Sequence, residues 1–211
     1  MMPKLKISRT WPVLKYCFMP SSMHWSGLLF LAIMLLSGCA EDPVPKQKGF
    51  HRIEFPQRIY STYAKSGCPY TFEYPKLGSI SYNDPDPCWM DIYFKPFDCN
   101  WHFTYRPLKG SREQRSKEFE EYRKLIYKHT VKATQIRESQ LETPRLRGTL
   151  FEVYGNVPTS AQLFLTDTAN RHVLEVSFYF FTAVKNDSLA PVIQYMKEDL
   201  LHLAESVEWE N

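Results

Sequence analysis

The pattern of hydrophobic and polar positions divides the chain at about residue 50. Beyond this point, short runs rich in aromatic and β-branched residues alternate with clusters of Pro, Gly, Asn and Asp. Runs of this kind between turn-forming residues predict β-strands. We expect strands at residues 50–55, 70–74, 90–94 and 101–105. Prolines in or beside some of these runs favour positions at the edge of a sheet.

The middle of the chain predicts one long amphipathic helix. Ser111 and Gln114 have the spacing of a capping box. Apolar residues then recur at intervals of three and four, which places them on one face of a helix. They are Phe119, Tyr122, Ile126, His129, Ala133 and Ile136. We expect this helix to end before Pro144.

The last third of the chain predicts strands followed by a helix. Runs at residues 149–154, 161–165 and 172–182 predict consecutive antiparallel strands, with a turn at 166–171. The terminal helix is expected to be capped by Asp187 or Ser188, with Pro191 in its first turn. Its predicted buried stripe comprises Leu189, Val192, Met196, Leu200, Leu203 and Val207. The prediction is an α+β fold: an antiparallel sheet packed by one long central helix and a C-terminal helix.

The first 38 residues have the charge and hydropathy profile of a signal peptide. Four basic residues precede an apolar run at 27–36, and no acidic residue occurs before Glu41. The run is shorter than the roughly 20 residues that a bilayer-spanning helix needs. The sequence Leu-Ser-Gly-Cys at 36–39 predicts cleavage between Gly38 and Cys39 and a lipid on the Cys39 thiol. We therefore expect a lipoprotein anchored in a membrane through Cys39.

Removal of residues 1–38 would leave a chain of 173 residues, long enough for one domain with a sizeable core. It would remove four of the 26 basic residues and none of the 23 acidic residues, leaving 22 against 23. No basic field that would suit nucleic acid remains. Residues 39–48 are polar and contain proline, which predicts an extended tether. A single globular domain is expected at 49–211.

Three cysteines follow Cys39, and an exported setting permits disulfides. We expect Cys68 to pair with Cys88. Such a bridge would close a loop of twenty residues and stabilise the fold by roughly 3 kcal/mol. Two alternatives stay open, because spacing alone does not fix connectivity. All three thiols could be free, or Cys99 could replace either partner.

The sequence shows no pattern of a catalytic or metal centre. The cysteines and histidines lack zinc-site spacing, the glycines form no phosphate loop, and no Gly-x-Ser-x-Gly motif occurs. Asp84 and Asp86 lie in an Asn-Asp-Pro-Asp-Pro segment typical of turns. His129 is expected to be a packed residue of the helix. We therefore predict no enzymatic activity, no metal, no small-molecule substrate and no cofactor beyond the lipid on Cys39.

Aromatic residues are concentrated between positions 60 and 105. Aromatic rings commonly fill the core of a small sheet, but a half-exposed cluster also makes a contact surface for a protein or a glycan. Both uses are open from the sequence. The candidates for a contact surface are Tyr70, Phe72, Tyr74 and Trp89.

Several segments resemble the gliding-motility lipoprotein GldD family of the Bacteroidetes. The longest reads Cys-Pro-Tyr-Thr-Phe-Glu-Tyr-Pro at 68–75, and the lipoprotein cleavage motif agrees independently. The others, in chain order, are residues 48–56, 88–92, 129–133, 153–156, 166–168, 186–189 and 206–209. The resemblance covers essentially the whole mature chain. Gln47, Cys99 and the segment 158–160 depart from the family pattern.

This resemblance implies a non-enzymatic, membrane-anchored component of the gliding motility and type IX secretion apparatus. Its expected partners are membrane lipid and other envelope proteins of that apparatus. We expect it in the outer membrane facing the periplasm. The acidic tract at 40–42 supports surface exposure as the alternative. The alternative function is a ligand-binding lipoprotein that holds a glycan or lipid on its aromatic face. The order of elements is similar to that of the Mog1 and PsbP-like α/β/α arrangement.

Overall fold

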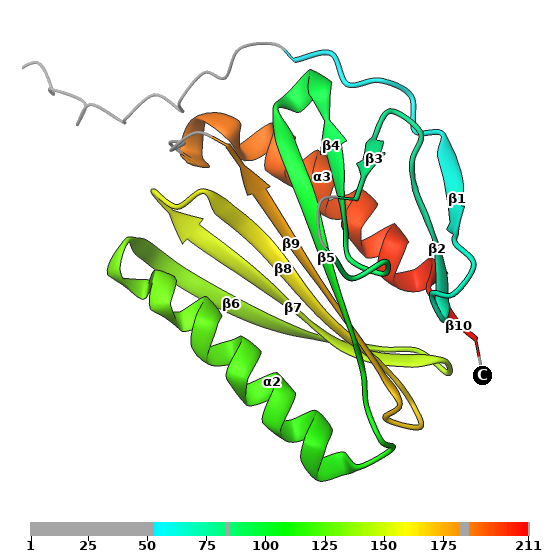
Figure 1. The fold of residues 1–211 in the computed structure, drawn as a ribbon. Helices are drawn as coiled ribbons and strands as arrows, with labels where there is room; N and C mark the ends of the chain where they lie inside the picture. Colours follow the sequence, from blue (N-terminus) through cyan, green and yellow to red (C-terminus); the bar gives the residue numbers. More distant parts are fainter. Residues whose placement is uncertain (1–52, 83–84, 182–185, 211) are drawn as a thin grey trace, which may run out of the picture. The chain divides into compact units, whose positions relative to one another are not determined.

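The computed structural model describes residues 53–82, 85–181 and 186–210 (Figure 1). The predicted signal peptide, the Gly38–Cys39 cleavage site and the tether at 39–48 lie outside these residues. The described residues form two helices and two antiparallel sheets. The α+β class predicted from the sequence is therefore confirmed.

Seven strands form the larger sheet, in the order β3-β4-β5-β9-β8-β7-β6. They are β3 (Ser79–Ser81), β4 (Met90–Phe94), β5 (Cys99–Pro107), β6 (Ala133–Glu142), β7 (Leu146–Gly155), β8 (Thr159–Asp167) and β9 (His172–Phe180). The three consecutive antiparallel strands predicted late in the chain are β7, β8 and β9. β5 pairs with β9 along its whole length, from Cys99 opposite Phe180 to Pro107 opposite His172. Strands β6, β7 and β8, which lie between β5 and β9 in the chain, therefore pair on the other side of β9 from β5.

A second, smaller sheet has the order β1-β2-β10. It comprises β1 (Tyr60–Ala64), β2 (Tyr70–Pro75) and β10 (Glu208–Trp209), which brings the C-terminal end of the chain beside β2. The strand predicted at 50–55 is wrong for residues 53–55, which belong to no sheet. Pro56 cannot donate to a ladder, and this segment packs on a helix instead.

The central helix, α2 (Arg112–Tyr127), begins where the sequence predicts. The backbone N–H of Gln114 donates to Ser111 Oγ at 3.3 Å, as expected of an N-cap. The reciprocal half of the predicted capping box is absent from the described contacts. Gln114 Oε1 instead accepts a hydrogen bond from the backbone N–H of Lys109.

The predicted end of this helix is wrong. A 3-10 turn, η2 (Lys128–Val131), follows Tyr127 and leads directly into β6. His129 lies in this turn, and its side chain is outside the described residues. Ala133 and Ile136 belong to β6, where β7 supplies a pairing partner. The β-branched residues between 130 and 136 suit an extended strand better than a helix.

The terminal helix, α3 (Asn186–Ser206), carries the predicted buried stripe. Val192, Met196, Leu200, Leu203 and Val207 are at most 4% exposed, and Leu189 packs against them while partly buried. The helix begins at Asn186, so Pro191 lies in its second turn rather than its first. For the same reason Asp187 and Ser188 lie inside the first turn rather than at the N-cap, so the predicted cap is wrong.

The two helices cover opposite faces of the large sheet (Figure 1). Side chains alternate between the faces of a strand. In β8, Leu163 therefore belongs to the core on the α3 side, whereas Phe164 packs against Phe119 of α2 with ring centroids 5.3 Å apart. The small sheet lies on the α3 side, where Phe72 stacks on Phe103 at 5.0 Å. The main core fills this side, and a smaller one lies beneath α2.

Candidate functional site

The segment that enters the domain is fixed to α3 by aromatic packing. The ring of Phe55 stacks on that of Tyr195, with centroids 4.6 Å apart. The Tyr195 hydroxyl donates a hydrogen bond to the carbonyl oxygen of Pro56 at 2.9 Å. Phe55 also packs near Phe97 of the short turn η1 (Lys95–Phe97). These contacts hold an extended segment that has no sheet partner.

An ion pair between an exposed arginine and a buried carboxylate strengthens the same attachment. Arg58 Nε lies 2.8 Å from Asp199 Oδ1, and the Asp199 side chain is fully buried in α3. The Tyr60 hydroxyl donates to the same oxygen at 2.8 Å. Burial raises the pKa of Asp199, while the bonds from Tyr60 and Arg58 act in the opposite direction. We call Phe55, Arg58, Tyr60, Tyr195 and Asp199 the N-terminal clamp.

Cys68 and Cys88 form a disulfide in the structure, and Cys99 is buried without a disulfide partner. The bridge joins the segment between β1 and β2 to the residues just before β4. Burial strongly raises the pKa of the Cys99 thiol, which keeps it in the unreactive protonated form. All three cysteines thus have structural positions in the core.

The predicted aromatic contact surface is wrong for two of its four residues, Tyr70 and Phe72. Tyr70 and Phe72 are 0% and 1% exposed, because the alternation of β2 turns both rings into the main core. Tyr74 and Trp89 are half-buried, and the indole N–H of Trp89 donates to the carbonyl oxygen of Tyr105 at 2.9 Å. Tyr70 and Phe72 therefore fill the core instead of forming a contact surface.

Exposed aromatic rings gather elsewhere, on the α2 side of the large sheet. Phe181, just beyond β9, is 58% exposed. Its ring centroid lies 5.6 Å from those of Tyr93 and Tyr179, both half-buried. The sequence signal was the alternation of β4 and β9, which sends Tyr93 and Tyr179 to the face opposite the main core. Which face is covered could not be read from that alternation alone.

An acid–base pair lies on the same open part of the sheet. His102 Nδ1 is 2.9 Å from Asp91 Oδ1, and Ser177 stands opposite His102 in the next strand. The Ser177 hydroxyl donates to Gln162 Oε1 at 3.4 Å. The described contacts contain no hydrogen bond from Ser177 to His102. The arrangement thus lacks the serine–histidine contact by which a base activates a nucleophile.

A buried carboxyl group, that of Glu175, lies on the α2 side of the large sheet, near the His102–Asp91 pair. Glu175 is 7% exposed, and its Oε1 has no hydrogen-bond partner among the described residues. Its Oε2 lies 3.7 Å from Arg106 Nη2, but Arg106 Nη1 makes a closer ion pair with Glu118 of α2 at 2.8 Å. Burial raises the pKa of Glu175 to about 7, with Arg106 opposing the shift. The group therefore titrates near neutral pH.

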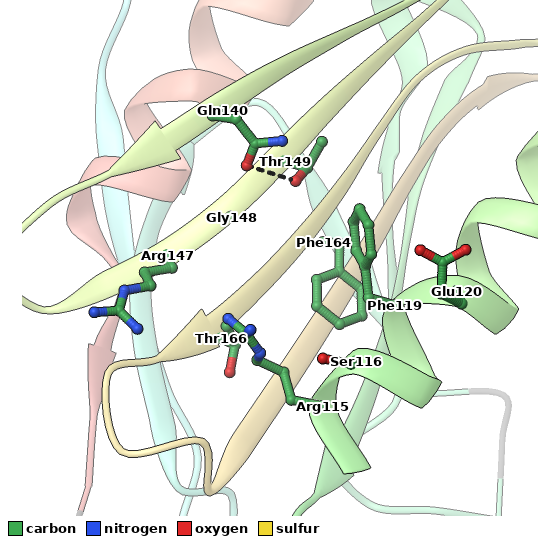
Figure 2. Close-up of a pocket in the computed structure, with 10 residues that line it drawn as sticks. All are labelled: Arg115, Ser116, Phe119, Glu120, Gln140, Arg147, Gly148, Thr149, Phe164 and Thr166. Carbon is green, nitrogen blue, oxygen red and sulfur yellow. Dashed lines mark hydrogen bonds between the residues drawn. The ribbon is translucent and has the colours of Figure 1, made fainter. Parts of the chain in front are cut away.

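A cationic pocket of about 230 Å³ opens between α2 and strands β6 to β8 (Figure 2). Figure 2 shows Arg115 and Phe119 projecting from α2, with Arg147 on β7. Phe119 and Phe164 give the pocket an apolar part. Arg147 is paired with Glu142 at 3.5 Å, whereas the side chain of half-buried Arg115 makes no hydrogen bond or ion pair with a described residue. We call this pocket the α2 pocket.

The described residues offer few other starting points for chemistry. No group of three or more His, Cys, Asp or Glu side chains in the described ranges could hold a metal ion. No helix among the described residues is both long enough and apolar enough to cross a bilayer. The α2 pocket was missed from sequence because Arg115, Arg147 and Thr166 are far apart along the chain and share no motif.

These features define a small α+β domain that is attached through its N-terminal segment to one helix and carries a cationic pocket beside the other. The chain belongs to the gliding motility lipoprotein GldD family, whose family model matches residues 40–209. No curated protein gives a significant match to the sequence.

Among solved structures, the chain is similar to the solution structure of cyanobacterial PsbP (CyanoP) from Synechocystis sp. PCC 6803. The identity is 10%, the TM-score is 0.44, and the match covers 75% of this chain and 97% of that one. At this TM-score the similarity carries no argument about the fold. It carries no argument about function.

Proposed function

We propose that the protein is a lipid-anchored, non-enzymatic docking component of the gliding motility and type IX secretion apparatus. The observation that carries this proposal is the family match over residues 40–209. The lipid on Cys39 would hold the protein in the outer membrane, with the domain in the periplasm. The domain would then bring other envelope proteins of the apparatus to the membrane.

The N-terminal clamp supports a role under mechanical load. The lipid and tether precede Phe55, so a force on the membrane anchor reaches the domain through this segment. Arg58 and the buried Asp199 would pass it to α3, whose apolar stripe is part of the main core. The pair resists separation because breaking it leaves the buried Asp199 carboxylate without its cation.

The α2 pocket supports docking of an acidic partner. Arg115 is half-buried and makes no ion pair with a described residue, although Glu120 also lines the pocket. Its guanidinium is therefore available for a partner's carboxylate, with which it can form two parallel hydrogen bonds. Phe119 and Phe164 would contact the apolar part of the incoming side chain. The partner class is therefore a protein that presents a carboxylate on a partly apolar surface.

The test is a mild-detergent pull-down of the tagged full-length protein from its own membranes, with partners identified by mass spectrometry. We expect components of the gliding and type IX machinery with the wild type and their loss with Cys39→Ala, which cannot be lipidated. Arg115→Glu should lose the partner that docks at the α2 pocket, whereas the matched surface change Arg112→Glu should keep it. A clean preparation without partners would contradict the proposal.

Localisation needs a separate measurement. Digestion of intact cells with a protease, followed by detection of the domain, distinguishes the two faces of the outer membrane. We expect protection in intact cells and digestion after the outer membrane is permeabilised. Digestion in intact cells would instead support the surface-exposed alternative.

A further inference from the structure

A second cavity lies on the opposite side of the sheet from the α2 pocket. It has a volume of about 740 Å³, more than three times that of the α2 pocket, and falls in the range of ligand sites. The end of β7, the beginnings of β6 and β8, and the middle of α3 form its walls. We call it the α3 cavity.

Backbone irregularities concentrate at this end of the sheet. The pairing of β6 with β7 shifts between Ala133 and Gln135, and that of β8 with β9 shifts between Thr159 and Ala161. Gly155, which lines the cavity, has φ +117°, and a Cβ there would lie 2.7 Å from the backbone nitrogen of Thr134. Bulges re-aim side chains and are frequent beside functional sites.

A buried hydroxyl without a partner lines the cavity. Ser160 follows the shift in β8 and is 3% exposed, and its Oγ has no hydrogen-bond partner among the described residues. Buried polar groups are nearly always hydrogen-bonded. The hydroxyl can both donate and accept, so a ligand hydroxyl group in the cavity would satisfy it.

Two of the three charged groups that line the cavity form an ion pair with each other, and the third, Lys132, is exposed at the rim. Lys197 Nζ lies 2.8 Å from Glu152 Oε1, and the Tyr154 hydroxyl donates to the same oxygen at 3.1 Å. Burial by itself would raise the pKa of Glu152, but the hydrogen bond and the charge of Lys197, together with the Tyr154 hydrogen bond, outweigh it and lower the pKa, so the carboxylate is charged at neutral pH. The pair leaves oxygen and nitrogen atoms at the wall without a net charge.

We propose that the α3 cavity binds a neutral saccharide. Beyond the ion pair and Lys132 at the rim, its polar side chains are amides and hydroxyls, which suit a ligand with many hydroxyl groups. They are Thr134, Gln135, Asn156, Ser160 and Gln194. Tyr154 is 37% exposed and, with Ile193, provides an apolar surface for the face of a sugar ring.

Other ligand classes fit these walls less well. An acyl chain would leave the Ser160 hydroxyl and the Lys197–Glu152 pair buried without polar contacts, which is costly. A phosphate would need a free cation, but Lys197 is paired and Lys132 is exposed at the rim. A neutral polyhydroxylated ligand offers hydrogen bonds to the polar groups of the walls and needs no free cation. This inference uses a different face of the domain from the docking proposal and does not depend on it.

The experiment is calorimetric titration of the full-length protein in lauryldimethylamine oxide, a detergent without a sugar head group. The probes are maltotriose, cellotriose and triacetylchitotriose, with inorganic phosphate as the charged comparison. We expect saturable binding of at least one trisaccharide and none of phosphate. Tyr154→Ala should weaken that binding about tenfold or more, the size expected for loss of a ring contact and its hydrogen bond.

The matched control is Tyr127→Ala, because Tyr127 is 39% exposed on α2, at the other face of the sheet. It should bind the trisaccharide as the wild type does. Gln194→Ala changes only an exposed residue of α3 and supplies a second cavity variant if Tyr154→Ala melts early. Failure of the folded wild type to bind any of the three trisaccharides overturns the proposal. So does equal binding by the wild type and both cavity variants.

Discussion

The buried carboxyl group of Glu175 gives a sharp test of the energetics of this fold. In the folded protein it is 7% exposed and has one oxygen without a described partner, and its pKa is raised to about 7. Burial is the dominant cause, because the charged form loses its hydration. The change Glu175→Gln keeps the shape of the side chain and removes its ability to become charged.

The size and sign follow from the pKa of the two states. The unfolded value is 4.5 and the folded value about 7, and each unit corresponds to about 1.4 kcal/mol, so the shift is worth roughly 3 kcal/mol. A pKa raised by folding means that the native state binds the proton more tightly. Its contribution to stability is complete below pH 4.5 and is lost as the pH rises through 7. The Glu175→Gln variant has no group to ionise at this position, so its stability does not fall in this way as the pH rises.

The assay is urea unfolding of the full-length protein and its Glu175→Gln variant at pH 4.5 and pH 8.5. We expect the free energy of unfolding of the variant, relative to the wild type, to rise by roughly 3 kcal/mol between the two pH values. Glu205→Gln, exposed on α3, is the control and should show no such rise. A Glu175→Gln difference that is the same at both pH values would refute the reasoning.

Two further predictions concern the stability contributed by the disulfide and by the Arg58–Asp199 ion pair. Replacing Cys68 and Cys88 together by serine should lower the free energy of unfolding by roughly 3 kcal/mol, because the unfolded chain regains the freedom of a loop of about twenty residues; an unchanged urea midpoint would contradict this. Arg58→Ala leaves the fully buried Asp199 without its cation and should destabilise by about 3 kcal/mol in the same assay. Glu198→Gln removes only the exposed partner of Arg58 and should change little, so equal losses would argue against the role of burial.

Some elements of the fold follow from local pattern alone. The stripe from Val192 to Val207 is spaced as a helix and is buried as one. The short runs rich in β-forming residues at 70–74 and 90–94, each between turn-forming residues, likewise predicted β2 and β4. Such elements are predictable because the local period and the tertiary environment agree.

Residues 128–136 show why other elements are not predictable in this way. Ala133 and Ile136 continue the helical spacing of α2, yet they also fit a strand, and the pairing of β6 with β7 decides between the two. Residues 53–55 have the composition of a strand, but no sheet partner meets them. In both cases a long-range contact, which local spacing does not contain, supplies the free energy that selects the conformation.

The candidate sites depend still more on tertiary structure. The sequence determined an α+β class, no enzymatic motif, and a family that the comparison confirms. It could not place Tyr70 and Phe72 in the core rather than on the surface, because an aromatic residue in an alternating strand is compatible with either. The α2 pocket and the α3 cavity join residues from strands and helices far apart in sequence. Only packing decides which faces are covered, since burial is a property of two surfaces that meet.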